Sequence, residues 1–281
     1  MMESGRRRSR NTSLRLYILL GVYLLVVSFP FYYMALSSLR TPKDVYNREQ
    51  MLTPANLTLI NYETVFGNTR MLLWLQNSVT VALTSTSISV VIGVLAAYAL
   101  ARLKFFGSRS LARSVLFMYL LPGSLLFIPL FLVISGLGLL NTTWALIISY
   151  QTFNVPFCTW LLLGYFRTMP VELEDAALID GCTRMGVLTR IVLPLAGPGI
   201  VTAFIFGFTN SWNEFLFAAV MVQRTELRTI PVGLYSFQVG DVLLWGQLMA
   251  AALIATLPVV VLFMFVQRYV VQGLTVGSVK G

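Results

Sequence analysis

The segment TMPVELEDAALIDGCTRMGVLTRIVLP, residues 168–194, separates two long apolar runs. Four of the chain's eleven acidic residues lie in it: Glu172, Glu174, Asp175 and Asp180. Thr168 can cap a helix that has Pro170 near its first position, and carboxylates in the first turn suit the positive end of the helix dipole. Gly181 suits the left-handed residue that ends such a helix, and Thr183 can cap a second one. The segment therefore predicts two short polar helices.

The composition around this segment is that of a membrane protein. Hydrophobic residues make up 57% of the 281 positions and charged residues 11%, against about 25% charged in soluble domains. A helix needs roughly 20 apolar residues to cross the hydrocarbon core. We expect an all-α integral membrane protein with six transmembrane helices, at residues 16–38, 72–103, 115–134, 144–166, 195–222 and 245–267.

Basic residues predict the orientation of these spans. Five arginines precede the first span, which places the N-terminus in the cytoplasm because loops rich in Lys and Arg stay there. That span is too long for a signal-peptide core and is expected to remain uncleaved. We expect a cytoplasmic tail at 1–15, a six-span domain at 16–268 and a cytoplasmic tail at 269–281. Segment 168–194 then lies in the cytoplasm between the fourth and fifth spans.

The inventory of reactive side chains excludes several functions. The chain has no histidine and two cysteines, Cys158 and Cys182, so no Cys/His metal cluster or disulfide framework is expected. No G-x4-G-K-[ST] phosphate-binding loop occurs, so the chain cannot supply ATP hydrolysis. A membrane-embedded enzyme is the least favoured class.

Small residues recur at every fourth position of the second span: Ser85, Ser89, Gly93, Ala97 and Ala101. Small residues at this spacing let two membrane helices approach closely. The alternative is chance spacing in an alanine-rich helix.

The first polar helix of segment 168–194 has a face suited to a partner. Leu173, Ala176, Ala177 and Asp180 share one side at helical spacing. A helix lying on lipid headgroups would instead carry Lys and Arg on its polar face. The acidic sequence before Arg184 favours docking to protein, with the interfacial helix as the alternative.

The same residues resemble a family signature. Asp175-Ala176-Ala177, then Gly181, and then Ile191, Leu193 and Pro194 match the EAA loop, E-A-A-x3-G-x9-I-x-L-P, of the membrane subunits of binding-protein-dependent ABC importers. The run ELEDAALIDG is similar to the sugar-importer branch, in which ELEEAARIDGA is typical. Further similar stretches, in order, are NYETVF, LQNSVTVAL, AAYALARLKFFG, PGSLLFIPLF, GLGLLNTTWAL, SWNEFLFA and GLTVGSVKG. The chain resembles the maltose-permease G subunit class, although Asp175 stands where the family usually has Glu.

This resemblance implies a function and partners. The chain would be a permease subunit of the bacterial or archaeal cytoplasmic membrane that moves a sugar or oligosaccharide inward by alternating access. Its partners would be a second homologous permease, a cytoplasmic ABC ATPase dimer that binds ATP and Mg²⁺, and an extracytoplasmic binding protein. It would bind no cofactor and no nucleic acid itself.

The resemblance also assigns site residues. Coupling to the ATPase would fall to Glu174, Asp175, Ala176, Ala177, Asp180 and Gly181. The loop that reaches the binding protein would contain Gly233, Tyr235 and Gln238. The C-terminal contact with the ATPase would contain Gly277 and Lys280.

Polar residues within the spans are candidates for a substrate pathway or gate: Asn210, Trp212, Asn213 and Glu214, with Gln151 and Asn154 as weaker ones. Thr202, Thr209, Asn210, Asn213 and Glu214 would form one stripe on the fifth span. Intramembrane ionisable groups are functional candidates, and amides beside aromatic rings suit sugars. The alternative is that these groups hold helices together. An ion-coupled secondary transporter remains the second functional class, although a single intramembrane carboxylate and no detected repeat count against it.

Overall fold

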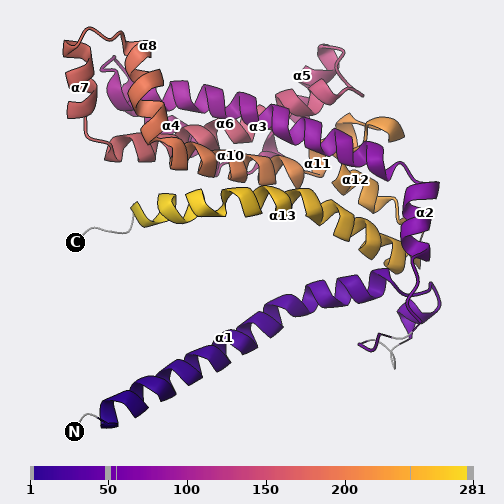
Figure 1. The fold of residues 1–281 in the computed structure, drawn as a ribbon. Coiled ribbons are helices and arrows are strands. Elements are labelled where there is room, and N and C mark those ends of the chain that lie inside the picture. Colours follow the sequence, from indigo (N-terminus) through magenta and orange to yellow (C-terminus); the bar gives the residue numbers. More distant parts are fainter. Residues whose placement is uncertain (1–2, 48–51, 55, 241, 277–281) are drawn as a thin grey trace. The chain divides into compact units, whose positions relative to one another are not determined.

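The computed structural model describes residues 3–47, 52–54, 56–240 and 242–276, with side chains between residues 16 and 267 of these ranges. The described chain is mostly helical (Figure 1). It also has one antiparallel two-stranded sheet of β1 (Gln238–Val239) and β2 (Val242–Leu243). The chain divides into two compact units, Met1–Thr69 with Ser236–Ile254 and Arg70–Tyr235 with Ala255–Gly281.

The smaller unit is organised around Asn61. It contains α1 (Glu3–Ser38), η1 (Asp44–Tyr46), α2 (Ile60–Asn68), the sheet and the first part of α13 (Trp245–Val276). The buried Asn61 amide donates to the carbonyls of Ser38 and Arg40, at 2.9 and 2.7 Å. Because a Cβ on Gly246 would lie 2.6 Å from the Asn61 amide nitrogen, only glycine allows α13 to pass this close. One amide thus ties the end of α1 to the starts of α2 and α13.

The larger unit holds the rest of the described helices. They are α3 (Met71–Arg102), α4 (Ser108–Leu120), η3 (Gly123–Leu126), α5 (Phe127–Gly136), α6 (Thr143–Thr168), α7 (Glu172–Ile179), α8 (Arg184–Val187), the π-helical η4 (Leu188–Val192), α9 (Leu193–Leu195), α10 (Gly197–Trp212), α11 (Leu216–Met221), η5 (Thr225–Leu227), α12 (Ile230–Tyr235) and the rest of α13. In Figure 1, α3, α6 and α10 run side by side.

The small-residue stripe of α3 is confirmed as a packing surface. Ser85, Ser89, Gly93 and Ala97 are buried. A Cβ on Gly93 would lie 2.8 Å from the Cβ of Cys158 in α6, closer than packed carbon atoms approach. The close approach of α3 and α6 therefore depends on the missing side chain, as expected for helices that associate within lipid.

Within the described residues, four helical segments are long and apolar enough to cross a membrane: Leu16–Ser38, Met71–Arg102, Thr143–Thr168 and Trp245–Gln267. Two further pairs of helices are sharply bent. Ser108–Leu120 and Gly123–Gly136 meet at 94°, and Arg184–Leu195 and Gly197–Trp212 meet at 77°. The structure therefore supports four to six membrane-spanning segments.

Breaks in the helices correct two expectations from the sequence. The third span is not one helix through 115–134, because the chain breaks at Leu121 and Pro122, where proline cannot continue the helix hydrogen bonding. The fifth span is not one helix through 195–222, because α10 ends at Trp212 and α11 begins at Leu216. Pro30, Pro156 and Pro258 lie inside continuous helices.

Candidate functional site: the segment between α6 and α10

Segment 168–194 forms two short helical stretches, as expected. The first of them, α7, begins at a different residue from the one that the sequence predicts. Thr168 is the last residue of α6, and its hydroxyl donates to the Tyr165 carbonyl at 2.8 Å. It does not cap α7, which begins at Glu172 without a side-chain cap. Pro170 lies before the helix because its ring and missing N–H end α6 instead. Glu172, Glu174 and Asp175 occupy the first turn of α7, where carboxylates are favourable.

The turn between α7 and α8 agrees with the sequence. Gly181 has φ +88°, a conformation that glycine adopts without steric cost. The Thr183 hydroxyl accepts a hydrogen bond from the Gly186 N–H at 3.1 Å and caps α8. Local sequence therefore determines how α7 ends and where α8 begins.

A buried ion pair fastens α7 to the end of α3. The Arg102 Nε and the Glu174 Oε1 lie 2.6 Å apart, and their side chains are only 7% and 4% exposed. Arg102 also donates to the Met169 carbonyl at 3.0 Å, and the Tyr98 hydroxyl donates to Glu174 at 3.3 Å. Charge-assisted bonds of this kind are strong when desolvated. Arg102 and Tyr98 are absent from the residues expected at the site, although the predicted topology puts Arg102 on the same side as Glu174.

Burial separates the expected coupling residues into two groups. Glu174 and Ala177 face the protein, and Ala177 packs within the core of the larger unit. Ala177 therefore does not share the exposed side of Leu173, Ala176 and Asp180 as expected, because its side chain packs against Val187 and Leu188 in the core. Asp175, Ala176, Asp180 and Gly181 are exposed.

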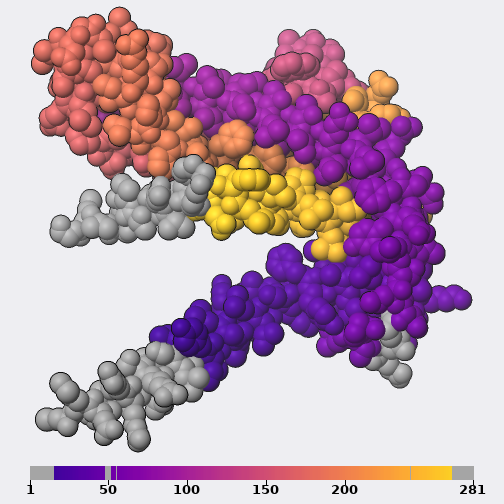
Figure 2. All heavy atoms as spheres, viewed as in Figure 1, coloured from indigo at the N-terminus to yellow at the C-terminus, as the bar shows by residue number. Residues whose placement is uncertain are grey.

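The outward side of α7 is an acidic and apolar surface. Leu173, Ala176, Ile179 and Asp180 are exposed there, with Ile179 at 86%. We call these four residues the α7 outer face. Figure 2 shows the segment containing α7 and α8 as a protruding end of the larger unit. Leu173 and Ile179 thus expose apolar surface beside the carboxylate of Asp180.

The polar groups of α6 join helices to one another. The Gln151 amide accepts from the Ser89 hydroxyl at 2.6 Å and donates to the Ser85 carbonyl at 3.1 Å. The Asn154 amide donates to the Ser211 hydroxyl at 2.7 Å. The Ser211 hydroxyl in turn lies 3.1 Å from the Ser85 hydroxyl. This network links α3, α6 and α10, so the geometry favours helix association for Gln151 and Asn154 over the substrate pathway.

Glu214 lies in the break between α10 and α11, so the expected continuous stripe is interrupted. Its carboxylate accepts from the N–H groups of Phe217 and Ala218, at 2.9 and 3.1 Å, and from the Tyr150 hydroxyl at 2.9 Å. Glu214 thus caps α11 and joins it to α6.

The other residues of this stripe differ in exposure. Asn210 and Asn213 are exposed, whereas Trp212 is buried and stacks on Phe208 with ring centroids 5.5 Å apart. The two asparagines therefore remain candidates for a pathway or gate, whereas the indole of Trp212 packs inside.

The residues expected to contact a binding protein differ in their exposure. Gly233 is buried, and a Cβ there would lie 2.3 Å from the Trp74 ring, so this glycine permits packing of α12 on α3. Tyr235 is exposed beside Phe215, with ring centroids 5.9 Å apart. Gln238 is exposed in β1. Gly277 and Lys280 lie outside the described residues.

The fold is that of a helical membrane protein, and its larger unit carries a short acidic helix, α7, anchored by a buried ion pair. Residues 89–276 match the family described as the binding-protein-dependent transport system inner membrane component. The chain belongs to this family, as its resemblance to importer permeases predicted, and it is a non-catalytic membrane subunit.

Individual relatives cover nearly the whole chain. The sulfoquinovosyl glycerol transport system permease protein SmoH of Agrobacterium fabrum is 38% identical over 265 residues, which are 94% of this chain and 93% of SmoH. The trehalose/maltose transport system permease protein MalG of Thermococcus litoralis is 36% identical over 272 residues, 95% of this chain and 97% of MalG.

A solved structure supports the fold. A chain of a bacterial ABC transporter involved in the import of the acidic polysaccharide alginate matches with a TM-score of 0.76 and 22% identity, covering 94% of this chain and 98% of that one.

Proposed function

We propose that this chain is one of two permease subunits of an ABC importer for a sugar or oligosaccharide. The family match over residues 89–276 carries this proposal, and the sugar transport systems of SmoH and MalG support the substrate class. Six spans, with each bent pair counted as one, would place both termini and α7 in the cytoplasm.

The α7 outer face would dock in a groove of a cytoplasmic ATPase, which holds ATP and Mg²⁺. The support is geometric, because the buried pair of Arg102 and Glu174 joins α7 rigidly to the end of the long helix α3. A docked helix can transmit the closing of two ATPase subunits only if it is fixed to the spans that must move. Asp175 and Asp180 would meet basic groups at the groove's edge.

The remaining partners would be a homologous second permease and an extracytoplasmic binding protein. Tyr235 is the exposed aromatic candidate for the binding-protein contact, and Asn210 and Asn213 are candidates for contact with the sugar. ATP-driven alternation between inward and outward forms would move the substrate.

Reconstitution tests the function directly. The binding protein is first screened for the sugar it captures, and that labelled sugar is offered to proteoliposomes that contain all subunits. We expect uptake to require internal ATP and the external binding protein and to persist after ion gradients are collapsed. Uptake driven by an ion gradient in liposomes containing this chain alone would contradict the proposal.

A further inference from the structure

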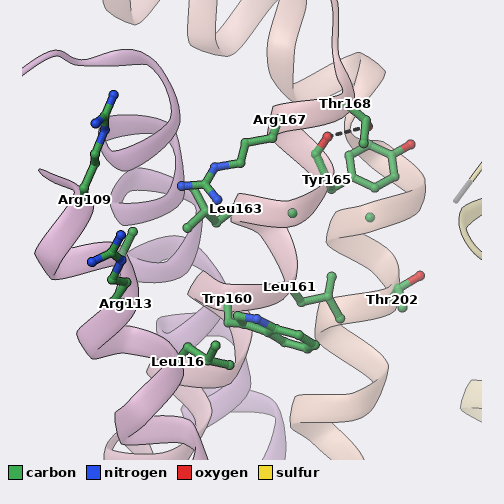
Figure 3. A pocket seen from close by; sticks show the side chains of 13 residues that line it. Arg109, Arg113, Leu116, Trp160, Leu161, Leu163, Tyr165, Arg167, Thr168 and Thr202 are labelled. Carbon is green, nitrogen blue, oxygen red and sulfur yellow. Dashed lines mark hydrogen bonds between the residues drawn. The ribbon is translucent and has the colours of Figure 1, made fainter.

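A hollow between α4, α6 and α10 of the larger unit is not used by the coupling site. Its volume is about 770 Å³. Leu116, Trp160 and Leu161 line its apolar part, and Arg109, Arg113 and Arg167 line one end (Figure 3). The described lining residues include no aspartate or glutamate.

Helix geometry gathers the charges at that end. On α4, Arg109, Arg113 and Leu116 follow one face at i, i+4 and i+7. On α6, Trp160 and Arg167 are seven residues apart and share one face. Here the apolar residue comes first along the chain, whereas on α4 the arginines come first. Figure 3 shows that the two helices run in opposite directions, so Arg109, Arg113 and Arg167 lie toward one end of the hollow and Leu116 and Trp160 toward the other.

These arginines are free to bind an anion. Among the described side chains, none of the three forms a hydrogen bond or an ion pair. Figure 3 shows the Arg167 guanidinium extending from α6 toward the helix that carries Arg113. Three exposed cations without partners form a positive cluster at the mouth of an apolar hollow.

The loop before α4 is suited to the membrane–water boundary. Phe106 is fully exposed, Phe105 is also exposed, and only Gly107 and Ser108 separate them from Arg109. At the edge of the hydrocarbon core, apolar phenylalanine rings can enter the acyl region while nearby arginines keep their charged groups among the headgroups. Basic pockets between transmembrane helices on the cytoplasmic side bind anionic lipid headgroups.

The lining is unsuited to a sugar. Apart from the arginines, its polar side chains are Tyr165, Thr168 and Thr202. The Thr168 and Thr202 hydroxyls already donate to the carbonyls of Tyr165 and Pro198, both at 2.8 Å. A neutral sugar lying against Leu116 and Leu161, in the part away from the arginines, would leave its hydroxyls there without partners, which is costly.

We propose that this hollow is a binding site for an anionic phospholipid of the cytoplasmic leaflet, such as phosphatidylglycerol. The phosphate binds between Arg113 and Arg167, with Arg109 at the rim, and an acyl chain lies against Leu116 and Trp160. The assignment to the cytoplasmic leaflet rests on the proposed function, whereas lipid binding is measured whether or not the protein transports a sugar.

Native mass spectrometry of the purified, fully assembled transporter tests the site. The complex is equilibrated with equal amounts of phosphatidylglycerol and phosphatidylcholine, and the retained lipids are counted. We expect the wild type to retain phosphatidylglycerol preferentially. Each arginine near the membrane surface contributes about fivefold to binding an anionic lipid, so R113Q/R167Q lowers retention about 25-fold.

Arg224→Gln is the matched control, because Arg224 is exposed and does not line the hollow. Its retained phosphatidylglycerol should equal that of the wild type. Equal retention of the two lipids by the wild type, or unchanged phosphatidylglycerol in R113Q/R167Q, would overturn the proposal. Displacement by free glycerol phosphate at millimolar concentration would also overturn it, by showing that the arginines bind the headgroup chemistry without the membrane lipid.

Discussion

The Arg102 guanidinium and the Glu174 carboxylate lie 2.6 Å apart in the interior, 72 residues apart in sequence. Their ion pair joins the end of a long membrane helix to the first turn of the short α7. Removing one partner of such a pair leaves a buried charge without compensation, which costs far more than an exposed pair is worth. The orientation of α7 therefore depends strongly on this ion pair, together with the packing of Ala177 in the core.

Replacing Glu174 with Ala should destabilise the protein by about 3–5 kcal/mol, because Arg102 is left buried and unpaired. The measurement is unfolding of the purified subunit in mixed micelles. Arg70→Gln is the control, since the pair of Arg70 and Glu226 is 3.8 Å long and about half exposed, and it should change stability by less than about 1 kcal/mol. Equal effects of the two substitutions would refute the anchoring role.

Substitutions of the two neighbouring alanines of α7 distinguish an effect on stability from an effect on ATPase docking. Ala176→Leu alters the α7 outer face and should leave subunit stability within about 0.5 kcal/mol, while it lowers ATP-driven uptake at least about tenfold. Ala177→Leu enlarges a buried side chain and should destabilise the subunit by about 1–3 kcal/mol. Pull-down of the ATPase by the permease complex reports docking. Normal ATPase binding and uptake by the Ala176→Leu protein would exclude this face as the contact.

Gly181→Val should cost about 1–2 kcal/mol, because φ +88° brings a β-carbon against the following carbonyl. Gly181→Asn should cost less, since asparagine tolerates this conformation better. Thermal unfolding of the two variants gives the comparison. Gly67→Ala is the control, as a Cβ there has no neighbour within 4 Å and the residue lies in α2; it should not destabilise. A Gly181→Val protein as stable as the wild type would contradict a left-handed turn.

Glu214→Ala should destabilise the protein by about 1–3 kcal/mol, because the Phe217 and Ala218 N–H groups and the Tyr150 hydroxyl lose their acceptor. Glu214→Gln keeps one carbonyl acceptor and should cost less. Asn213→Ala is the control, since its exposed amide bonds only the Thr209 carbonyl of its own helix. If Glu214 instead couples an ion to transport, the Gln variant would be fully stable and would lose gradient-dependent uptake.

The membrane class and much of the local structure of segment 168–194 could be predicted from the residues alone. Apolar length predicts spans because backbone hydrogen bonds must be satisfied within each helix in lipid. The turn at Gly181 and the cap at Thr183 are local, so they follow from residue type. The four-residue spacing of small side chains on α3 likewise predicts its close packing on α6.

Sequence rules for where a helix begins or breaks were less reliable when two neighbouring residues gave different predictions. Thr168 resembles a cap, yet Pro170 moves the start of α7 to Glu172, and Thr168 ends α6 instead. Pro122 coincides with a break of 94°, whereas Pro156 lies within the continuous α6. The surrounding helices decide which proline breaks a span, because a freed carbonyl can be satisfied by neighbours.

Composition, hydrophobic length and turn chemistry are properties of the local chain, so the residues alone predict a polytopic helical membrane protein with an acidic, capped segment between two spans. Which acidic side chains stay exposed depends on tertiary packing. Glu174 and Asp175 are neighbours of the same charge, yet Glu174 lies buried against Arg102 while Asp175 is exposed. The reason is that the partner comes from another helix, 72 residues away, and no local pattern records which side of α7 that helix covers.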